Sequence, residues 1–200
     1  MIEQTEHYHT MIFTQNKSMN QNDTSNRIIN ILSATSRKNI ENVINWMQSH
    51  GFFEAPASVI HHNNFRGGLA KHSLEVYEQA NVFNETFRLP QESVTICALL
   101  HDICKSDQFY ITPDNKPACR HNKLHLGHGI YSVSILKNEC QLPLSHEEEM
   151  AIWWHMGKHE ASKDNFEKEY QESKSIELCK LIQLADLTAA KITVSNKAQS

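Results

Sequence analysis

The amino-acid sequence predicts an all-α fold, a compact bundle of roughly six to eight helices. Three observations favour this class. Apolar residues recur at helical spacing in several stretches, and residues that can cap a helix N-terminus precede many of these stretches. Strand-like alternation of apolar and polar residues is nearly absent. A chain of 200 residues, 40% of them hydrophobic, can bury one core without disulfide bonds.

Two helices are expected near the N-terminus. Residues 1–23 are polar and rich in Asn and Gln, and we expect a leader there in which "HYHTMIF" forms a short extended piece. Thr24 or Ser25 can cap a first helix. Ser36 can cap a second, in "RKNIENVINWMQSH", and Gly51 would end it. The residues expected to face inward are Ile28, Ile29, Ile31, Leu32, Ile40, Val43, Ile44 and Met47.

Five further helices follow from the same periodicity, over residues 68–87, 91–105, 126–139, 145–157 and about 174–192. Pro90 stands just before the second of these. Ser145 can cap the fourth, and Ser173 or Ser175 the last. Residues 107–123 are typical of a loop, with a hairpin around "PDN".

The sequence divides into three parts. We expect a leader and helices at 1–51, a main domain at 52–192 and a polar tail at 193–200. No run of about 18 apolar residues predicts a membrane span, and the N-terminus does not have the pattern of a signal peptide. Five scattered cysteines without a CxxC pair indicate reduced thiols and a cytoplasmic location. A net charge of −4 argues against a broad nucleic-acid-binding surface.

Histidine is unusually frequent, with 13 residues, and histidine is the commonest protein metal ligand. Successive predicted helices each carry one candidate ligand or an adjacent pair: His72, His101 with Asp102, His128, His155 and Asp186. Facing helices of a bundle can direct such side chains at one centre. Imidazole and carboxylate ligands suit divalent iron, manganese, cobalt, nickel or zinc, and magnesium is a further candidate ion. Six ligands can supply two divalent ions a few ångströms apart.

Each candidate also has an ordinary structural interpretation. An isolated histidine on an apolar helical face, such as His72, is more often a hydrogen-bonded core residue than a ligand. Asp186 differs, because its carboxylate in "KLIQLADLTAA" would carry an uncompensated charge if it were buried. A cation partner would remove that cost. Two tryptophans beside His155 are typical of core packing.

Five motifs in order resemble the HD superfamily of metal-dependent phosphohydrolases, in particular its bacterial and prophage-associated branch. They are "GGLAKHSLEV", "ALLHDICK", "LGHGIYSVSIL", "AIWWHMG" and "LIQLADLTAA", within residues 52–192. The resemblance implies that His72, His101, Asp102 and Asp186 form a core metal site, and that His128 and His155 are the extra ligands of two-metal members. Cys104 stands where the family often has glycine, and its thiol could make the site sensitive to oxidation.

Further roles are expected around this site. Asp102 would bridge the two ions and orient a metal-activated water, while Lys105 would neutralise phosphate charge; Lys105 at a helix C-terminus could equally be an ordinary surface lysine. His62 and Arg66, with His61, could line the substrate entrance or be plain loop residues. His121 and His125 are weaker candidates.

The function expected from these residues is phosphohydrolase or phosphodiesterase action on a small phosphorylated substrate, a nucleotide or a related phosphoester. A diiron oxygenase resembling myo-inositol oxygenase would use the same six ligands. A nuclease is a third interpretation, disfavoured by the net charge and by the lack of an added nucleic-acid-binding module. A non-catalytic binding module is disfavoured because all six ligands are present. The sequence predicts no membrane partner and no oligomeric state.

Overall fold

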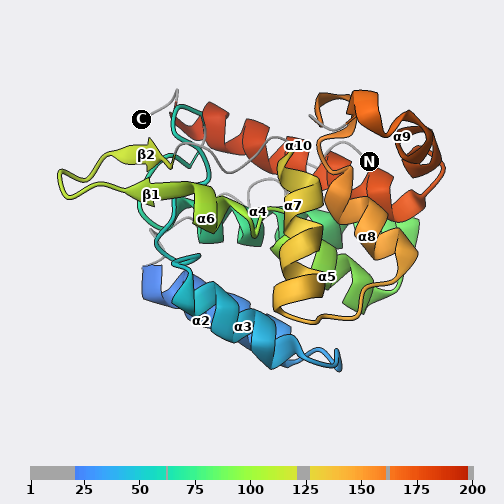
Figure 1. The fold of residues 1–200 in the computed structure, drawn as a ribbon, viewed down its shortest axis with the longest axis horizontal. Helices are drawn as coiled ribbons and strands as arrows, with labels where there is room; N and C mark the ends of the chain where they lie inside the picture. The colour runs from blue at the N-terminus through green and yellow to red at the C-terminus, as the bar shows by residue number, and fades with distance from the viewer. Residues whose placement is uncertain (1–20, 62, 121–126, 161–162, 198–200) are drawn as a thin grey trace, which may run out of the picture.

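The computed structural model describes residues 21–61, 63–120, 127–160 and 163–197, and the described chain is all-α, as predicted (Figure 1). The predicted leader falls mostly at residues 1–20, which lie outside the described residues, as does the expected extended piece. The helices are α2 (Gln21–Ser33), α3 (Ile40–Ser49), α4 (Gly68–Phe87), α5 (Gln91–Leu100), α6 (Lys105–Gln108), α7 (His128–Ser134), α8 (His146–Trp153), α9 (Glu167–Ser173) and α10 (Glu177–Lys197).

Shorter elements complete the described chain. A π-helical turn, η1 (Ile135–Glu139), continues α7, and two 3₁₀ turns, η2 (Gly157–His159) and η3 (Lys163–Asn165), lie between α8 and α9. Strands β1 (Phe109–Ile111) and β2 (Pro117–Cys119) pair antiparallel, with Tyr110 opposite Ala118. The hairpin predicted around "PDN" is therefore present, and Asn115 takes the left-handed conformation (φ 61°) that its turn requires.

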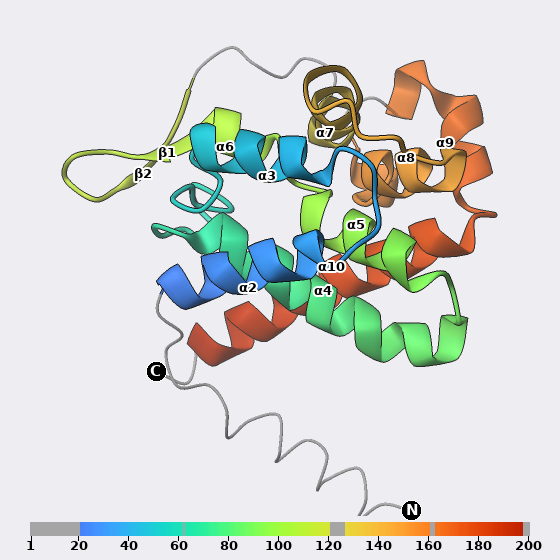
Figure 2. The ribbon, with the colours of Figure 1, turned by 90° about the horizontal axis from the view of Figure 1, so that it is seen from below.

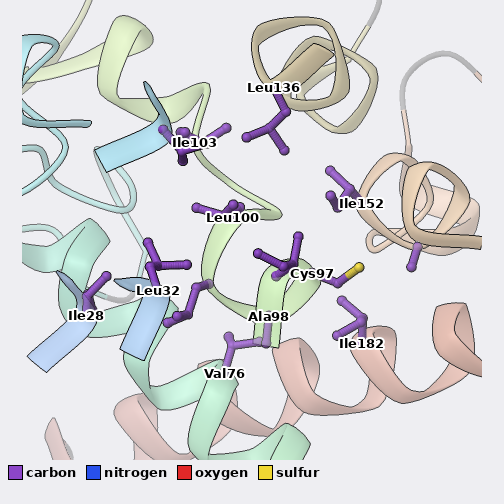
Figure 3. Packing of buried hydrophobic residues seen from close by; sticks show 14 of the residues in the cluster. Ile28, Leu32, Val76, Cys97, Ala98, Leu100, Ile103, Leu136, Ile152 and Ile182 are labelled. Atoms are coloured by element: carbon purple, nitrogen blue, oxygen red, sulfur yellow. The ribbon is translucent and has the colours of Figure 1, made fainter. Parts of the chain in front are cut away.

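Helix α10 packs along α4 and α8, and α4 packs on α5 (Figure 2). Helix α2 lies against α3, α4 and α5, so the N-terminal helices share one core with the rest. Figure 3 shows how this core draws on distant parts of the chain: Ile28 of α2, Val76 of α4, Ile152 of α8 and Ile182 of α10 are fully buried around α5. This core holds α4, α5, α8 and α10, the helices that carry or adjoin the candidate ligands.

The predicted helix starts at the N-terminus need correction. Helix α2 already begins at Gln21, before Thr24 and Ser25, although Ile28 and Leu32 are buried as expected. Ser36 does not cap α3, which begins only at Ile40. The backbone N–H of Ser36 instead donates to a carboxylate oxygen of Glu92 at 3.2 Å. A long-range acceptor thus replaces the local cap.

An ion-pair cluster binds the segment between α2 and α3 to α5 and α8. The Arg37 guanidinium donates to both carboxylate oxygens of Glu148 at 2.7 Å and to Glu92 at 2.7 Å. The predicted cap at Ser145 is confirmed, and Glu148 makes it a capping box, in which the Ser145 hydroxyl accepts from the Glu148 backbone N–H. Its carboxylate is almost fully buried, so these partners compensate its charge.

The ends of the later helices also differ from the sequence prediction. Helix α5 ends at Leu100 and α8 at Trp153, so the turns that follow carry His101, Asp102 and His155. Helix α9 was not predicted, because its heptapeptide "EKEYQES" carries only one aromatic and no aliphatic side chain. Helix α10 begins at Glu177, beyond both predicted caps. No helix in the described part of the chain is long and apolar enough to span a membrane.

Candidate metal centre

The adjacent residues His101 and Asp102 lie in the turn between α5 and α6, and both are buried. The Nδ1 atom of His101 lies 3.0 Å from the carbonyl oxygen of Ala98. Because a carbonyl only accepts, Nδ1 carries the proton and Nε2 keeps its lone pair. The same arrangement recurs at His155, whose Nδ1 donates to the Ile152 carbonyl oxygen at 2.7 Å. Backbone contacts thus orient both imidazoles as metal ligands are usually oriented.

The Asp102 carboxylate lies between two pairs of imidazoles. Its Oδ2 atom is 3.2 Å from Nε2 of His101 and 3.7 Å from Nε2 of His72. Its Oδ1 atom is 3.4 Å from Nε2 of His155 and 3.7 Å from Nε2 of His128. Each oxygen therefore faces a different pair, the arrangement that a carboxylate shared by two ions needs.

Asp186 extends the first of these pairs. Its Oδ1 atom lies 3.1 Å from Nε2 of His72, so α10 and α4 meet at this contact. Of the apolar residues that flank it in sequence, Leu184 and Leu187 are exposed and Ala185 is buried. The Asp186 side chain itself is only 16% exposed, and the imidazole of His72 is the group that compensates its charge.

A close backbone contact brings His128 to the cluster. Gly129 follows it in α7, and a Cβ atom there would collide with the carbonyl oxygen of Trp153. Only glycine therefore allows α7 to approach the end of α8 this closely. The imidazole rings of His128 and His155 pack edge to face at 5.0 Å between centroids as a result.

The donor set fits divalent metal ions. Three buried imidazole nitrogens, Nε2 of His101, His128 and His155, have no hydrogen-bond partner within the described chain, and neither does Oδ1 of Asp102. Such groups are costly to bury unless something else binds them. Among the described residues, two sets of three could hold an ion, with ligand atoms within 4.8 Å of one another: His72, His101 and Asp186, and His101, Asp102 and His155.

The electrostatics favour the protonation states that metal binding needs. Burial lowers the pKa of His101, and burial together with the Lys105 charge lowers the pKa of His128 to about 3. Burial alone would raise the pKa of Asp102, but Lys105 and His101 hold it well below its usual value. The imidazoles of His101 and His128 are therefore neutral and the Asp102 carboxylate is ionised near neutral pH. Burial alone would lower the pKa of His155, but contact with the Asp102 carboxylate raises it above its usual value. Lys105 contributes directly, since its Nζ lies 2.5 Å from Oδ2 of Asp102.

A cavity of about 580 Å³ opens onto the cluster. Four of the six candidate ligands reach its surface, namely His72, His128, His155 and Asp186, as does Lys105. The other lining residues are Ala57, Ser58, His61, Gln108, Phe109, Met156, Gly157, Lys158, His159, Gln183, Leu187 and Ala190. A cavity of this size suits a small-molecule ligand.

Of the residues predicted at the substrate entrance, only some can be placed relative to the cavity. His61 lines the cavity, whereas Arg66 is exposed and is not among the lining residues. His62, His121 and His125 lie outside the described residues. The expected oxidation sensitivity of Cys104 is not supported, because its thiol is buried and burial raises its pKa to about 12. All five cysteines are free.

Sequence reasoning missed Gln183, which joins two ligand-bearing segments. Its side-chain Nε2 donates to the carbonyl oxygen of Trp154 at 2.7 Å, next to His155, and Gln183 lies one helical turn before Asp186 in α10. That spacing was the available signal, since residues three apart share a helix face.

Comparison with known proteins adds one decisive observation: the model of the family described as "HD domain" matches residues 69–191. The chain belongs to the HD domain family. The predicted family is thereby confirmed, and the matched segment contains all six candidate ligands. The HD superfamily is generally one of metal-dependent hydrolases. No curated protein and no solved structure gave a significant match.

Proposed function

We propose that this HD domain protein is a metal-dependent phosphohydrolase or phosphodiesterase acting on a nucleotide or a related small phosphoester. The observation that carries the proposal is the division of the Asp102 carboxylate between two imidazole pairs, beside a cavity of about 580 Å³. The proposed location is the cytoplasm, in keeping with five free cysteines.

In this proposal His72, His101, Asp102 and Asp186 would hold one divalent ion, and Asp102 with His128 and His155 would hold a second. Bound divalent ions would supply Lewis acidity that activates a water molecule and neutralises charge on the phosphoryl oxygens. The backbone acceptors at Ala98 and Ile152 keep two of the imidazoles oriented. Because these imidazoles are already oriented, they need to reorganise less when substrate binds.

Lys105 is proposed as the residue that meets the phosphate. It lines the cavity and its side chain is 15% exposed, so its ammonium group can reach a ligand without leaving Asp102. The Asp102 charge counteracts the cost of burial and keeps the pKa of Lys105 raised, so the side chain stays cationic. A cation held at this position stabilises an anionic phosphoester group.

The test is phosphate release from a panel of nucleotides and simple phosphate monoesters and diesters. Protein loaded with Mn²⁺ or Co²⁺ should release product at equal rates with and without oxygen. Asp102→Asn should lose the activity, while Asp114→Asn, in the exposed hairpin turn, should keep it. If no ester is cleaved, the hydrolase proposal is wrong. If the iron-loaded protein also consumes oxygen and releases no phosphate, the oxygenase interpretation takes its place.

A further inference from the structure

The cavity extends well beyond the candidate metal centre. Its lining reaches from Ala57 and Ser58, before α4, to Ala190 near the end of α10, and includes Phe109 of β1. A volume of about 580 Å³ lies in the range of pockets that enclose a complete small molecule. The cavity therefore leaves room, beyond the metal centre, for a part of a ligand that the more distant lining residues would contact.

The charge of this lining is one-sided. Among the described lining residues, the carboxylate belongs to Asp186, which we assign to the metal centre. The remaining charged side chains there are Lys105 and Lys158, accompanied by the imidazoles of His61 and His159. The whole chain carries a net charge of −4, so a cavity with this lining departs from the average of the molecule. Such a lining favours anionic ligands.

The two lysines are not equivalent. Lys105 is committed to Asp102 at 2.5 Å, whereas Lys158 forms no ion pair with any carboxylate of the described chain. Lys158 belongs to η2, which follows His155 and begins at Gly157 with the left-handed φ of 54°. The bond from Gln183 to the Trp154 carbonyl oxygen fixes the start of this turn. Lys158 is exposed, so its ammonium group stands in solvent at the edge of the cavity, on an anchored segment beside the metal centre and without a carboxylate partner in the described chain.

We propose that Lys158 forms a second anion subsite, so that the preferred substrate is a phosphoester with a further anionic group, a second phosphate or a carboxylate. This inference rests on the proposed function, because the first phosphate is placed at the metal centre. Lys158 binds the group that does not react, and so determines which phosphoesters are chosen. A charge-assisted contact of this kind contributes about tenfold or more in affinity.

Calorimetric titration of the metal-loaded protein tests the subsite. The probes are propyl phosphate, propane-1,3-diyl bisphosphate and 3-(phosphonooxy)propanoate, which share a three-carbon body and differ in the second anion. We expect the wild type to prefer at least one of the two doubly substituted probes over propyl phosphate by about tenfold. Lys158→Met should abolish most of that preference, and Lys158→Arg should keep it. Lys168→Met, on exposed α9 and away from the cavity lining, is the matched control and should behave as wild type.

The outcomes separate the two proposals. If propyl phosphate binds but neither doubly substituted probe is preferred, or if Lys158→Met keeps the preference, the subsite is wrong and the proposed function stands. If none of the three probes binds to the metal-loaded protein, both the phosphate site at the metal centre and the subsite that depends on it are overturned.

Discussion

At the scale of single residues, the Asp102 carboxylate is the centre of the cluster. Oδ2 faces His72 and His101 while Oδ1 faces His128 and His155, all within 3.2–3.7 Å. A histidine ligand can serve one ion only, but a carboxylate can serve two. Loss of Asp102 should therefore damage the site more than loss of any one imidazole.

Asp102→Ala should lower metal content from about two ions per chain to one or fewer, and lower phosphate release by at least about 100-fold. Helical content should persist, because the apolar core is separate from this carboxylate and Lys105 can turn toward the cavity water. Elemental analysis, turnover and circular dichroism check the three parts. Turnover like that of the wild type in a folded Asp102→Ala protein would refute the two-metal hydrolase.

The residue types of the site could be predicted from sequence, but its surroundings could not. His72, His101, Asp102 and Asp186 follow the order of the helices, so a bundle brings them near one another. The acceptors of Nδ1 in His101 and His155 are backbone carbonyls, which every residue has and no sequence pattern marks. Gln183 and Lys158 are likewise ordinary polar residues until the fold places them beside the cavity.

At the scale of helices and turns, the close approach of α7 to α8 depends on Gly129. Gly129→Ala would place a methyl group against the Trp153 carbonyl oxygen, so one of the two helices must shift. We expect the free energy of unfolding to fall by about 1–3 kcal/mol, measured by urea denaturation. Val82→Ala, at an exposed position of α4, should change it by less than about 0.5 kcal/mol. Equal effects of the two substitutions would contradict this account of the contact.

The Arg37–Glu148 pair predicts how stability responds to acid. Burial would raise the pKa of Glu148, but the Arg37 hydrogen bonds and the capping contact at Ser145 lower it from 4.5. The unfolded chain therefore takes up the proton at higher pH than the folded protein does. The pair's stabilisation is complete above the unfolded pKa of about 4.5 and is lost as the pH falls through the lower folded pKa.

Glu148→Gln should accordingly destabilise the protein by about 1–3 kcal/mol at pH 7, and by clearly less at pH 3. Urea denaturation of both proteins at the two pH values measures the difference. Glu147→Gln, the exposed neighbour in the same helix, controls for the change in net charge. A Glu148→Gln effect that is the same at both pH values would show that the carboxylate charge does not contribute.

Element boundaries show where sequence reasoning ends. Helix α4 was predicted with the observed bounds, since apolar residues recur at helical spacing from Gly68, just after the N-cap residue Gly67. The Ser145 cap was predicted because a serine directly before a stretch with helical periodicity is a local pattern. Ser36 failed as a cap because its backbone N–H binds Glu92, which is remote in sequence. The π-helical turn η1 inside a predicted helix carries no local signal either.

At the scale of the whole molecule, one apolar core supports a candidate metal centre to which several segments contribute residues. The core spans α2 through α10, so helices outside the family match at 69–191 also stabilise the domain. The candidate ligands lie in α4, the turn after α5, α7, the turn after α8, and α10. Ligands so distant in sequence converge only in the folded protein. Metal binding should therefore stabilise the whole fold against unfolding.

The central claim is that these six side chains bind two divalent ions. Anomalous scattering from crystals saturated with Mn²⁺ tests it most directly. The account predicts two peaks on either side of Asp102, one within reach of His72, His101 and Asp186 and the other within reach of His128 and His155. An anomalous map without a peak among these residues would contradict it.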